Sequence, residues 1–310
     1  MVAYTVQRVL WTVPVLLTVA SITFLLMHFV PGGPWDREKR LPPGVVESLN
    51  RRYGLDNSLG EQYWSFMTSA LKGDLGVSYT YQGRGVTDII RQGLPATATV
   101  GGVAFLIVVG VGIPLGMAAA MRRNSVVDYV SMSFATVFAS IPGFVLGILM
   151  VIVLSVRWHL LPTGGLESPS HVIMPALALA ALPTAFIARV TRASVLEELG
   201  QDYVRTARAK GLSSPMVQYR HVLRNALIPV LTSLGPELAA LITGSFIIET
   251  VFSVPGIGRL FVQGVFQRDY GLIMGTVLFY AFVIAVLNLL VDILYAVVDP
   301  RIRPTRTDDA

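Results

Sequence analysis

Cysteine is absent from this chain of 310 residues, and lysine occurs only three times. The lack of cysteine excludes disulfide bonds, thiolate metal sites and a cysteine nucleophile. A nucleotide-binding P-loop needs a glycine–lysine pair, but Lys39, Lys72 and Lys210 follow glutamate, leucine and alanine. The four histidines are scattered without metal-site spacing, at His28, His159, His171 and His221. We therefore expect no catalytic residue, no metal site and no cofactor on this chain.

Charged residues are also scarce, at 14% of the chain against 53% hydrophobic residues, and the mean hydropathy is +0.63. Soluble domains have about 25% charged residues, so this composition excludes them and predicts a membrane protein. The net charge of +5 comes from 24 basic and 19 acidic residues. Membrane orientation explains that excess better than nucleic acid does, and we expect no nucleic-acid partner.

Six apolar stretches have the length of roughly 20 residues that a membrane-spanning helix needs. They are residues 9–30, 99–121, 129–156, 172–188, 230–248 and 272–298. The first is too long for a cleavable signal peptide and lacks a cleavage site, so we expect a retained helix. The sequence thus predicts an all-α membrane protein with six transmembrane helices: helix 1 in residues 1–30, an external segment in 31–98, and a core in 99–310.

Basic residues in short loops indicate which face is cytoplasmic. They follow the second span, fill the segment between the fourth and fifth spans, and follow the sixth. Both termini are therefore expected in the cytoplasm. Residues 31–98 hold eight basic and seven acidic residues. Loops of this length are translocated across the membrane regardless of their charge, so the basic residues here do not indicate a cytoplasmic location. We expect this segment to form an external, water-facing helical cap.

Prolines in the middle of spans mark places where a helix could bend, because proline removes a backbone hydrogen bond. They are Pro114, Pro142, Pro175 and Pro183. For each of these prolines, the sequence is compatible both with a hinge that moves and with a fixed kink that serves packing.

The cytoplasmic segment 189–229 is too long for a hairpin connection and is patterned as two helices. Asp202 can cap a helix over residues 203–210, and Gly211 supplies the left-handed residue that ends it. Pro215 suits the first turn of a second helix. The small residues Ala207 and Ala209 would allow close approach of a partner. The basic residues suit an acidic docking cleft or anionic lipid, and a helix lying on the inner leaflet stays open as the alternative.

The run Asp-Tyr-Val-Arg-Thr-Ala-Arg-Ala-Lys-Gly-Leu-Ser at 202–213, with His-Val-Leu-Arg-Asn-Ala-Leu-Ile-Pro at 221–229, resembles a known signature. It is similar to the coupling loop of permease subunits of ATP-binding cassette importers, in the variant of the dipeptide/oligopeptide and nickel group. Further similar stretches are residues 53–56, 73–76, 161–165, 249–258 and 299–301. The general signature begins with Glu-Ala-Ala, where this chain has Arg205-Thr206-Ala207, and this departure favours the peptide group.

The resemblance implies the type I importer permease fold, with a cytoplasmic coupling helix between helices 4 and 5. It implies that an ATPase contacts the following residues: Tyr203, Arg205, Thr206, Ala207, Arg208, Ala209, Lys210, Gly211, Leu212 and Ser213. The implied partners are a second, paralogous permease, two ATPase subunits that hold ATP and Mg, and an external solute-binding protein. The implied setting is a bacterial or archaeal inner membrane, and the implied substrate is a peptide, with nickel complexes or oligosaccharides as rivals.

Ionisable residues inside spans are candidates for a substrate path. We expect Glu237, with Ser233 and Ser245 on the same span, to face the pore, and Glu249 to border it. Glu249 could instead cap the turn that follows it.

Two further roles are predicted near the ends of these spans. Phe252 and Pro255 are expected at an outer gate, and Asp292 is expected to pair with a cytoplasmic arginine. A proton-coupled secondary transporter that uses Glu237, Glu249 and Asp292 is the alternative from a different class, although no repeat relates the two halves of the chain.

Overall fold

The computed structural model describes residues 2–35, 42–244 and 246–298. Most of this part of the chain is helical, and it holds no strand beyond an isolated antiparallel bridge between Val77 and Gly85. The all-α architecture expected from the sequence is confirmed. Ser245 of the expected substrate path and residues 299–301 of the family-like pattern lie outside the described residues.

Among the described residues, five helical segments are long and apolar enough to cross a membrane. They are Arg8–Phe29, Val86–Met121, Ser170–Leu199, Ser214–Val251 and Tyr270–Val291. Each of them overlaps one of the six expected spans. The first lies in α1 (Val2–Phe29), and the second joins α4 (Val86–Ile107), the π-helical η1 (Val108–Gly112) and α5 (Ile113–Met121).

The third expected span, residues 129–156, is broken rather than straight. It consists of α6 (Val126–Ser140) followed by α7 (Gly143–Met150) and the π-helical η2 (Val151–Arg157), and the two halves are bent by 97°. Pro142 explains the break, because it has no N–H to donate and its ring holds Ile141 in an extended conformation (φ −97°, ψ 121°). The other mid-span prolines lie within continuous helical segments: Pro114, Pro175 and Pro183.

The segment between the fourth and fifth spans is shorter than the expected loop 189–229. The fourth span, α8 (Ser170–Leu199), continues as a helix through residues 189–199. The fifth begins early, because α10 (Ser214–Met216) and η3 (Val217–Val222) lead into α11 (Leu223–Thr243). The expected bounds came from hydropathy, which marks only the apolar part of a helix. Residues such as Arg, Glu, Leu and Ala have high helix propensity and extend these helices beyond their apolar parts. Between these two spans lies the separate helix α9 (Asp202–Ala209).

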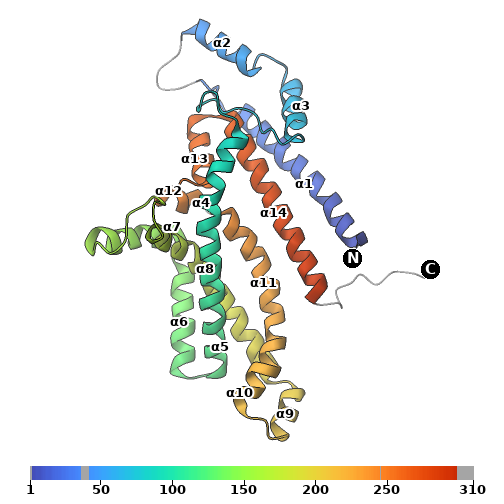
Figure 1. Cartoon of the computed structure of the whole chain (residues 1–310), viewed down its shortest axis with the longest axis vertical. Helices are drawn as coiled ribbons and strands as arrows, with labels where there is room; N and C mark the ends of the chain where they lie inside the picture. Colours follow the sequence, from blue (N-terminus) through green and yellow to red (C-terminus); the bar gives the residue numbers. More distant parts are fainter. Residues whose placement is uncertain (1, 36–41, 245, 299–310) are drawn as a thin grey trace, which may run out of the picture.

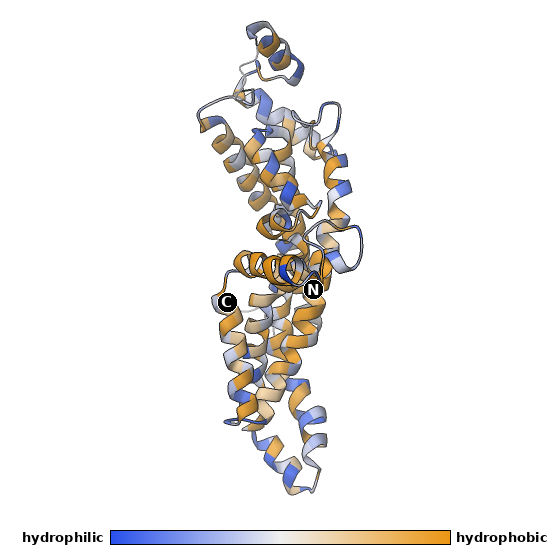
Figure 2. Ribbon diagram, turned by 90° about the vertical axis from the view of Figure 1, so that its left-hand side faces the viewer, coloured by the Kyte–Doolittle hydropathy of each residue, from blue (hydrophilic) through white to orange (hydrophobic). Residues whose placement is uncertain are grey.

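The remaining helices are α2 (Pro43–Tyr53), α3 (Leu59–Ala70), α12 (Phe246–Val251), α13 (Ile257–Gln267) and α14 (Tyr270–Val298). We call α2 and α3 the cap. The cap lies at one end of the molecule and α9 at the other (Figure 1). Hydrophobic residues dominate the helices between these ends (Figure 2). Residues 86–98, expected in the external segment, belong to α4.

Helix α8 lies at the centre of the bundle and packs against α4, α5, α6, α7 and α11, while α14 packs against α1 and α11. The largest apolar cluster contains small residues from facing helices, such as Ala104, Ala176 and Ala180. Small residues let helices approach closely, which is what holds helices together inside a membrane. The core therefore combines close helix contacts at alanines with larger buried side chains such as Ile187 and Leu241.

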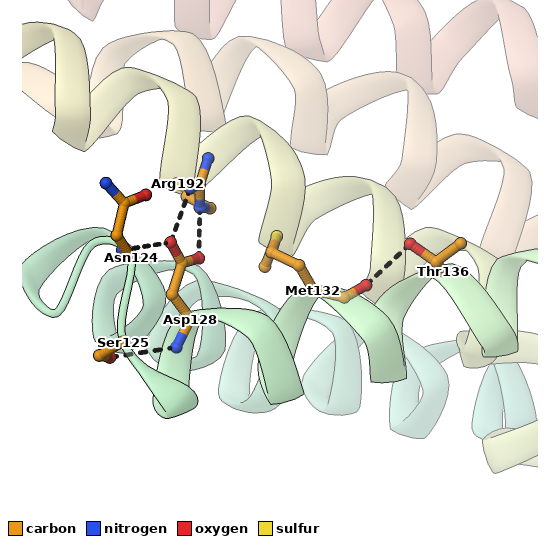
Figure 3. A network of polar contacts seen from close by, with 6 residues as sticks. All are labelled: Asn124, Ser125, Asp128, Met132, Thr136 and Arg192. Carbon is orange, nitrogen blue, oxygen red and sulfur yellow. Dashed lines mark hydrogen bonds and ion pairs between the residues drawn. The ribbon is translucent and has the colours of Figure 1, made fainter.

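A bidentate ion pair joins α6 to α8 near the α9 end of the bundle (Figure 3). Arg192 donates from Nε to Asp128 Oδ1 at 2.7 Å and from Nη2 to Oδ2 at 2.8 Å. The backbone N–H of Asn124 also donates to Asp128, at 3.0 Å. The Asp128 side chain is only 3% exposed, so this carboxylate depends on these donors.

Breaking this pair should destabilise the protein. We expect Arg192→Gln to lower the free energy of unfolding by about 3 kcal/mol, because it leaves the buried Asp128 carboxylate uncompensated, and Asp128→Asn to lower it less, because the Arg192 side chain is 28% exposed. The double variant should recover part of that loss. Thermal and chaotrope unfolding in detergent measures all three. The control is Arg205→Gln, which removes the exposed pair of Arg205 with Asp202 (3.3 Å) and should leave stability unchanged. Additive losses in the double variant would show that the two side chains do not stabilise each other.

Candidate functional site

Helix α9 ends in a Schellman motif. The helix runs from Asp202 to Ala209, and Gly211 follows it with φ 79°. The N–H of Gly211 donates to Arg208 O at 2.9 Å, and the N–H of Leu212 donates to Ala207 O at 3.3 Å. These two bonds satisfy carbonyls that a helix end otherwise leaves free. The left-handed conformation expected at Gly211 is confirmed, whereas the N-cap is Gln201, one residue before the expected Asp202.

The inner face of α9 is buried against the ends of three membrane helices. We call this contact the α9 cluster, and its buried members are Ala120, Val195, Val204, Ala207, Val217, Val222 and Ala226. They come from α5, α8, α9, η3 and α11. Leu212 packs against the same cluster from beyond the helix end. Because one apolar contact joins all of these elements, a displacement of α9 would be transmitted to the spans.

The expected contact residues divide between two faces of α9. Ala207, expected to admit a partner, is 7% exposed and packs against other residues of this chain, so the structure places it on the inner face rather than on the face open to a partner. Leu212 is half-buried. The residues that face outward are Tyr203, Arg205, Thr206, Arg208, Ala209, Lys210, Gly211 and Ser213. The structure thus offers a partner a basic outer face.

Tyr203 fastens α9 to its neighbours rather than projecting freely. Its hydroxyl donates to a carboxylate oxygen of Glu198, at the end of α8, and lies 3.4 Å from His221 O in η3. Burial, and then the hydrogen bond to Glu198, raise the pKa of Tyr203 above its ordinary value. Tyr203 therefore stays a neutral donor that positions the helix.

A cleft of about 590 Å³ lies beside α9, and sequence reasoning had used its basic residues only to infer orientation. It is lined by Tyr203, Arg220, His221, Arg224, Asn225, Ile228 and Leu231. Arg220 and Arg224 are four residues apart and both are exposed. Two cations on one side of a helix suit an acidic group of a partner. The spacing of Arg220 and Arg224, four residues apart, was the sequence signal that could have identified this pair.

Glu249 lies in a closed polar nest rather than along an open path. The Thr97 hydroxyl donates to Glu249 Oε1 at 2.7 Å, and the N–H of Arg259 donates to Oε2 at 3.1 Å. Thr97 in turn accepts from the N–H of Ile257 at 2.9 Å. The residue is 2% exposed. Glu249 therefore caps the start of α13 and ties it to α4, which favours the capping alternative over contact with substrate.

The nest leaves no room for a side chain at Gly256. A Cβ there would lie 2.4 Å from Glu249 Oε2 and 2.5 Å from Thr97 Oγ1. The glycine in the family-like stretch 249–258 is thus required by the closeness of these two polar atoms. Thr97 was missed by sequence reasoning, because no local pattern marks a partner 152 residues away.

The two expected gate residues lie in different surroundings. Phe252 is 1% exposed and belongs to a buried cluster with Met174, Ala178 and other residues, so it is a core residue. Pro255 is exposed. The structure does not bring these two side chains together as a gate.

Glu237 is half-buried on α11, and we find no hydrogen-bond or ion-pair partner for its carboxylate among the described residues. It falls on the side of α11 that contributes Leu234 and Leu241 to the main cluster. Ser233, one turn earlier, donates to Pro229 O at 2.9 Å. The side chain of Asp292 lies outside the described residues. Of the expected path residues, Glu237 and Ser233 are those the structure leaves available.

No group of three or more His, Asp or Glu side chains that could hold a metal ion is found in the described part of the chain. Exposed basic residues gather on the outer face of α9 and along the adjoining cleft.

Two family models match the chain. One, described as the inner membrane component of a binding-protein-dependent transport system, matches residues 112–304. The other, described as the N-terminal part of such a membrane component, matches residues 1–101.

Curated relatives match almost end to end. The chain is 41% identical over 303 residues to the dipeptide transport system permease protein DppB of Bacillus subtilis, covering 98% of each. It is 38% identical over 305 residues to the oligopeptide transport system permease protein OppB of Salmonella typhimurium, covering 98% of this chain and 100% of that one.

Solved structures share the fold at lower identity. A chain of the inward-facing MetNI methionine ABC transporter aligns with a TM-score of 0.57 and 19% identity, over 68% of this chain and 96% of that one. A chain of an amino acid ABC transporter aligns with a TM-score of 0.56 and 20% identity, over 67% and 94%. The importer permease fold expected from the sequence is confirmed.

The nest around Glu249 predicts a stability effect. Thr97→Val should lower the free energy of unfolding by about 1–3 kcal/mol, because it removes a donor from a buried carboxylate and an acceptor from the N–H of Ile257. Thr97→Ser keeps the hydroxyl and should lose much less. The measurement is the unfolding midpoint of each purified variant in detergent. A Thr97→Val protein as stable as the parent would refute the capping role.

Proposed function

Because the chain belongs to the family of inner membrane components of binding-protein-dependent transport systems, we propose that it is the permease subunit of a peptide importer driven by ATP. The named activities of relatives that match over 98% of this chain support the peptide class. Nickel complexes and short oligosaccharides are the rival cargoes. The chain forms the membrane path and performs no chemistry itself.

The proposed partners follow from the family to which the chain belongs. In such a transporter, ATP and Mg would bind two ATPase subunits, and the absence of a glycine–lysine pair for a P-loop in this chain agrees with that division. A second, paralogous permease would complete the path, and an external solute-binding protein would deliver the substrate. In this arrangement the chain lies in the inner membrane with the α9 end and both termini in the cytoplasm.

The observation that supports this proposal most is that α9 has an exposed basic face and a buried apolar face. Its outer face presents Arg205, Arg208 and Lys210, while its inner face is buried in the α9 cluster. An ATPase bound to the outer face would move the ends of α5, α8 and α11 together. ATP can shift the transporter between its two arrangements only if it binds one of them more tightly.

The alternative of a proton-coupled transporter gains no support from the carboxylates. Glu249 is enclosed by Thr97 and by backbone N–H groups of α13, so it has no open route to a proton path. Glu237 lies on another helix, α11. The geometry therefore favours energy input at α9.

Crosslinking tests the proposed partner directly. The chain has no cysteine, so Ala209→Cys introduces a unique thiol on the exposed face of α9. With all partner chains present, a photoreactive label at this position should crosslink to an ATPase subunit. Labelling of lipid alone, in a transporter that still takes up peptide, would support the leaflet-surface alternative and contradict the proposed coupling.

Gly211 provides a matched pair of variants. A Cβ at this position would meet nothing within 4 Å, so a substitution tests only its positive φ of 79°. A valine in that conformation costs about 1–2 kcal/mol, which lowers the ratio of intact to opened cap by about 5- to 30-fold. Asparagine tolerates it. Gly211→Val should therefore reduce peptide uptake per ATP hydrolysed in proteoliposomes, and Gly211→Asn should not. Equal coupling in both variants would contradict the role of this cap.

A further inference from the structure

Helix α3 of the cap reaches down along the first membrane span. The hydroxyls of Tyr63 in α3 and Ser21 in α1 are 2.7 Å apart, and the rings of Tyr63 and Phe24 meet edge to face at 5.3 Å. Ser21 precedes the end of α1 at Phe29 by two turns, or about 12 Å at 1.5 Å per residue. Half of the hydrocarbon core is about 15 Å thick. The inner face of α3 is therefore within reach of one leaflet.

Several contacts hold α3 in this position. Tyr63 and Phe66 pack against a buried cluster formed by Phe24, Met27, Ile273 and Met274 of α1 and α14. The Gln62 side chain lies 3.4 Å from the ring nitrogen Nε2 of His28, at the last turn of α1. Figure 1 shows α3 beside the end of α1. The helix is thus seated on the two spans rather than tethered above them.

The side of α3 turned away from these two spans exposes two large apolar side chains next to the polar residues Glu61 and Ser65. Trp64 is 69% exposed and Leu71, which follows the last residue of the helix, is 85% exposed. They are seven residues apart, so they share one side of the helix. Between them, the Thr68 hydroxyl donates back to Trp64 O at 2.9 Å, which satisfies its donor within the helix.

The charges of α3 lie at its ends. Glu61 is the one charged residue within the helix, and it forms a capping box with Ser58 at the first turn. Lys72 follows the last turn. A tryptophan on the exposed side of a short helix and a lysine at its end are both features of helices in the membrane interface. The last turns of α1 also expose apolar side chains there: Leu25, Leu26 and Phe29.

We propose that α3 is an interfacial helix whose Trp64–Leu71 face contacts phospholipid in the leaflet at the cap end. Lipid fits this face better than a protein partner does, because the inner face of the same helix touches a span at leaflet depth and the neighbouring surface of α1 is itself apolar. The proposal revises the water-facing cap expected from the sequence. It concerns a lipid contact and holds whatever the chain transports.

Single cysteines make the proposal testable in the assembled transporter, since this chain has none of its own. Trp64→Cys and Leu71→Cys are labelled with bimane and reconstituted in phosphatidylcholine nanodiscs, with the cysteines of partner chains replaced. Leu26→Cys, on α1, is the lipid-facing control, and Arg51→Cys, on the exposed side of α2, is the water-facing control. Nitroxide-labelled phosphatidylcholine and aqueous iodide serve as the two quenchers.

We expect labels at positions 64 and 71 to lose emission with nitroxide lipid, as at position 26, and to resist iodide. Quenching by iodide as at position 51, without quenching by lipid, would overturn the proposal. So would protection from both quenchers that appears only when the partner chains are added, because a protein would then cover this face. Quenching measured on this chain without its partners distinguishes contact with lipid from cover by a partner protein, because only lipid is present in that sample.

Discussion

The apolar contact between α9 and the ends of α5, α8 and α11 is the interaction on which the coupling account depends. A helix of eight residues is unstable in water by itself, because the cost of its first turn is not recovered over so short a length. Burial of Val204 and Ala207, and the bonds around Gly211, stabilise it. The same burial turns Arg205, Arg208 and Lys210 outward. Burial of one face of α9 therefore stabilises the helix, holds it against the spans and leaves its basic residues exposed.

Three buried carboxylates accept backbone N–H groups at a helix start or just before it. Asp128 accepts from the N–H of Asn124 before α6, Glu249 from that of Arg259 in α13, and Asp269 from that of Leu272 in α14. Helix starts leave N–H groups without partners, and lipid offers none. Each carboxylate also binds a distant side chain, namely Arg192, Thr97 or Ser78. The polar groups that complete the helices thus also connect them.

Local signals predicted the parts of the fold that local physics decides. Five apolar runs were recognised as spans, and Gly211 as a helix end, because hydropathy and positive φ are properties of short segments. The bend at Pro142 followed from the proline, but its size of 97° depends on what α7 packs against. Ala207 and Ala209 are identical residues, and only tertiary contacts bury the first. The pairing of Thr97 with Glu249 across 152 residues had no sequence signal at all.

Distance measurement by electron spin resonance tests most directly whether α9 moves as one body with the spans. Spin labels at Ala209, on α9, and at Arg123, after α5, can be placed uniquely in this cysteine-free chain. In the assembled transporter, the account predicts the same distance distribution without nucleotide and with ATP bound. A shift between these two states would show that α9 moves against α5, and would contradict rigid coupling through the α9 cluster.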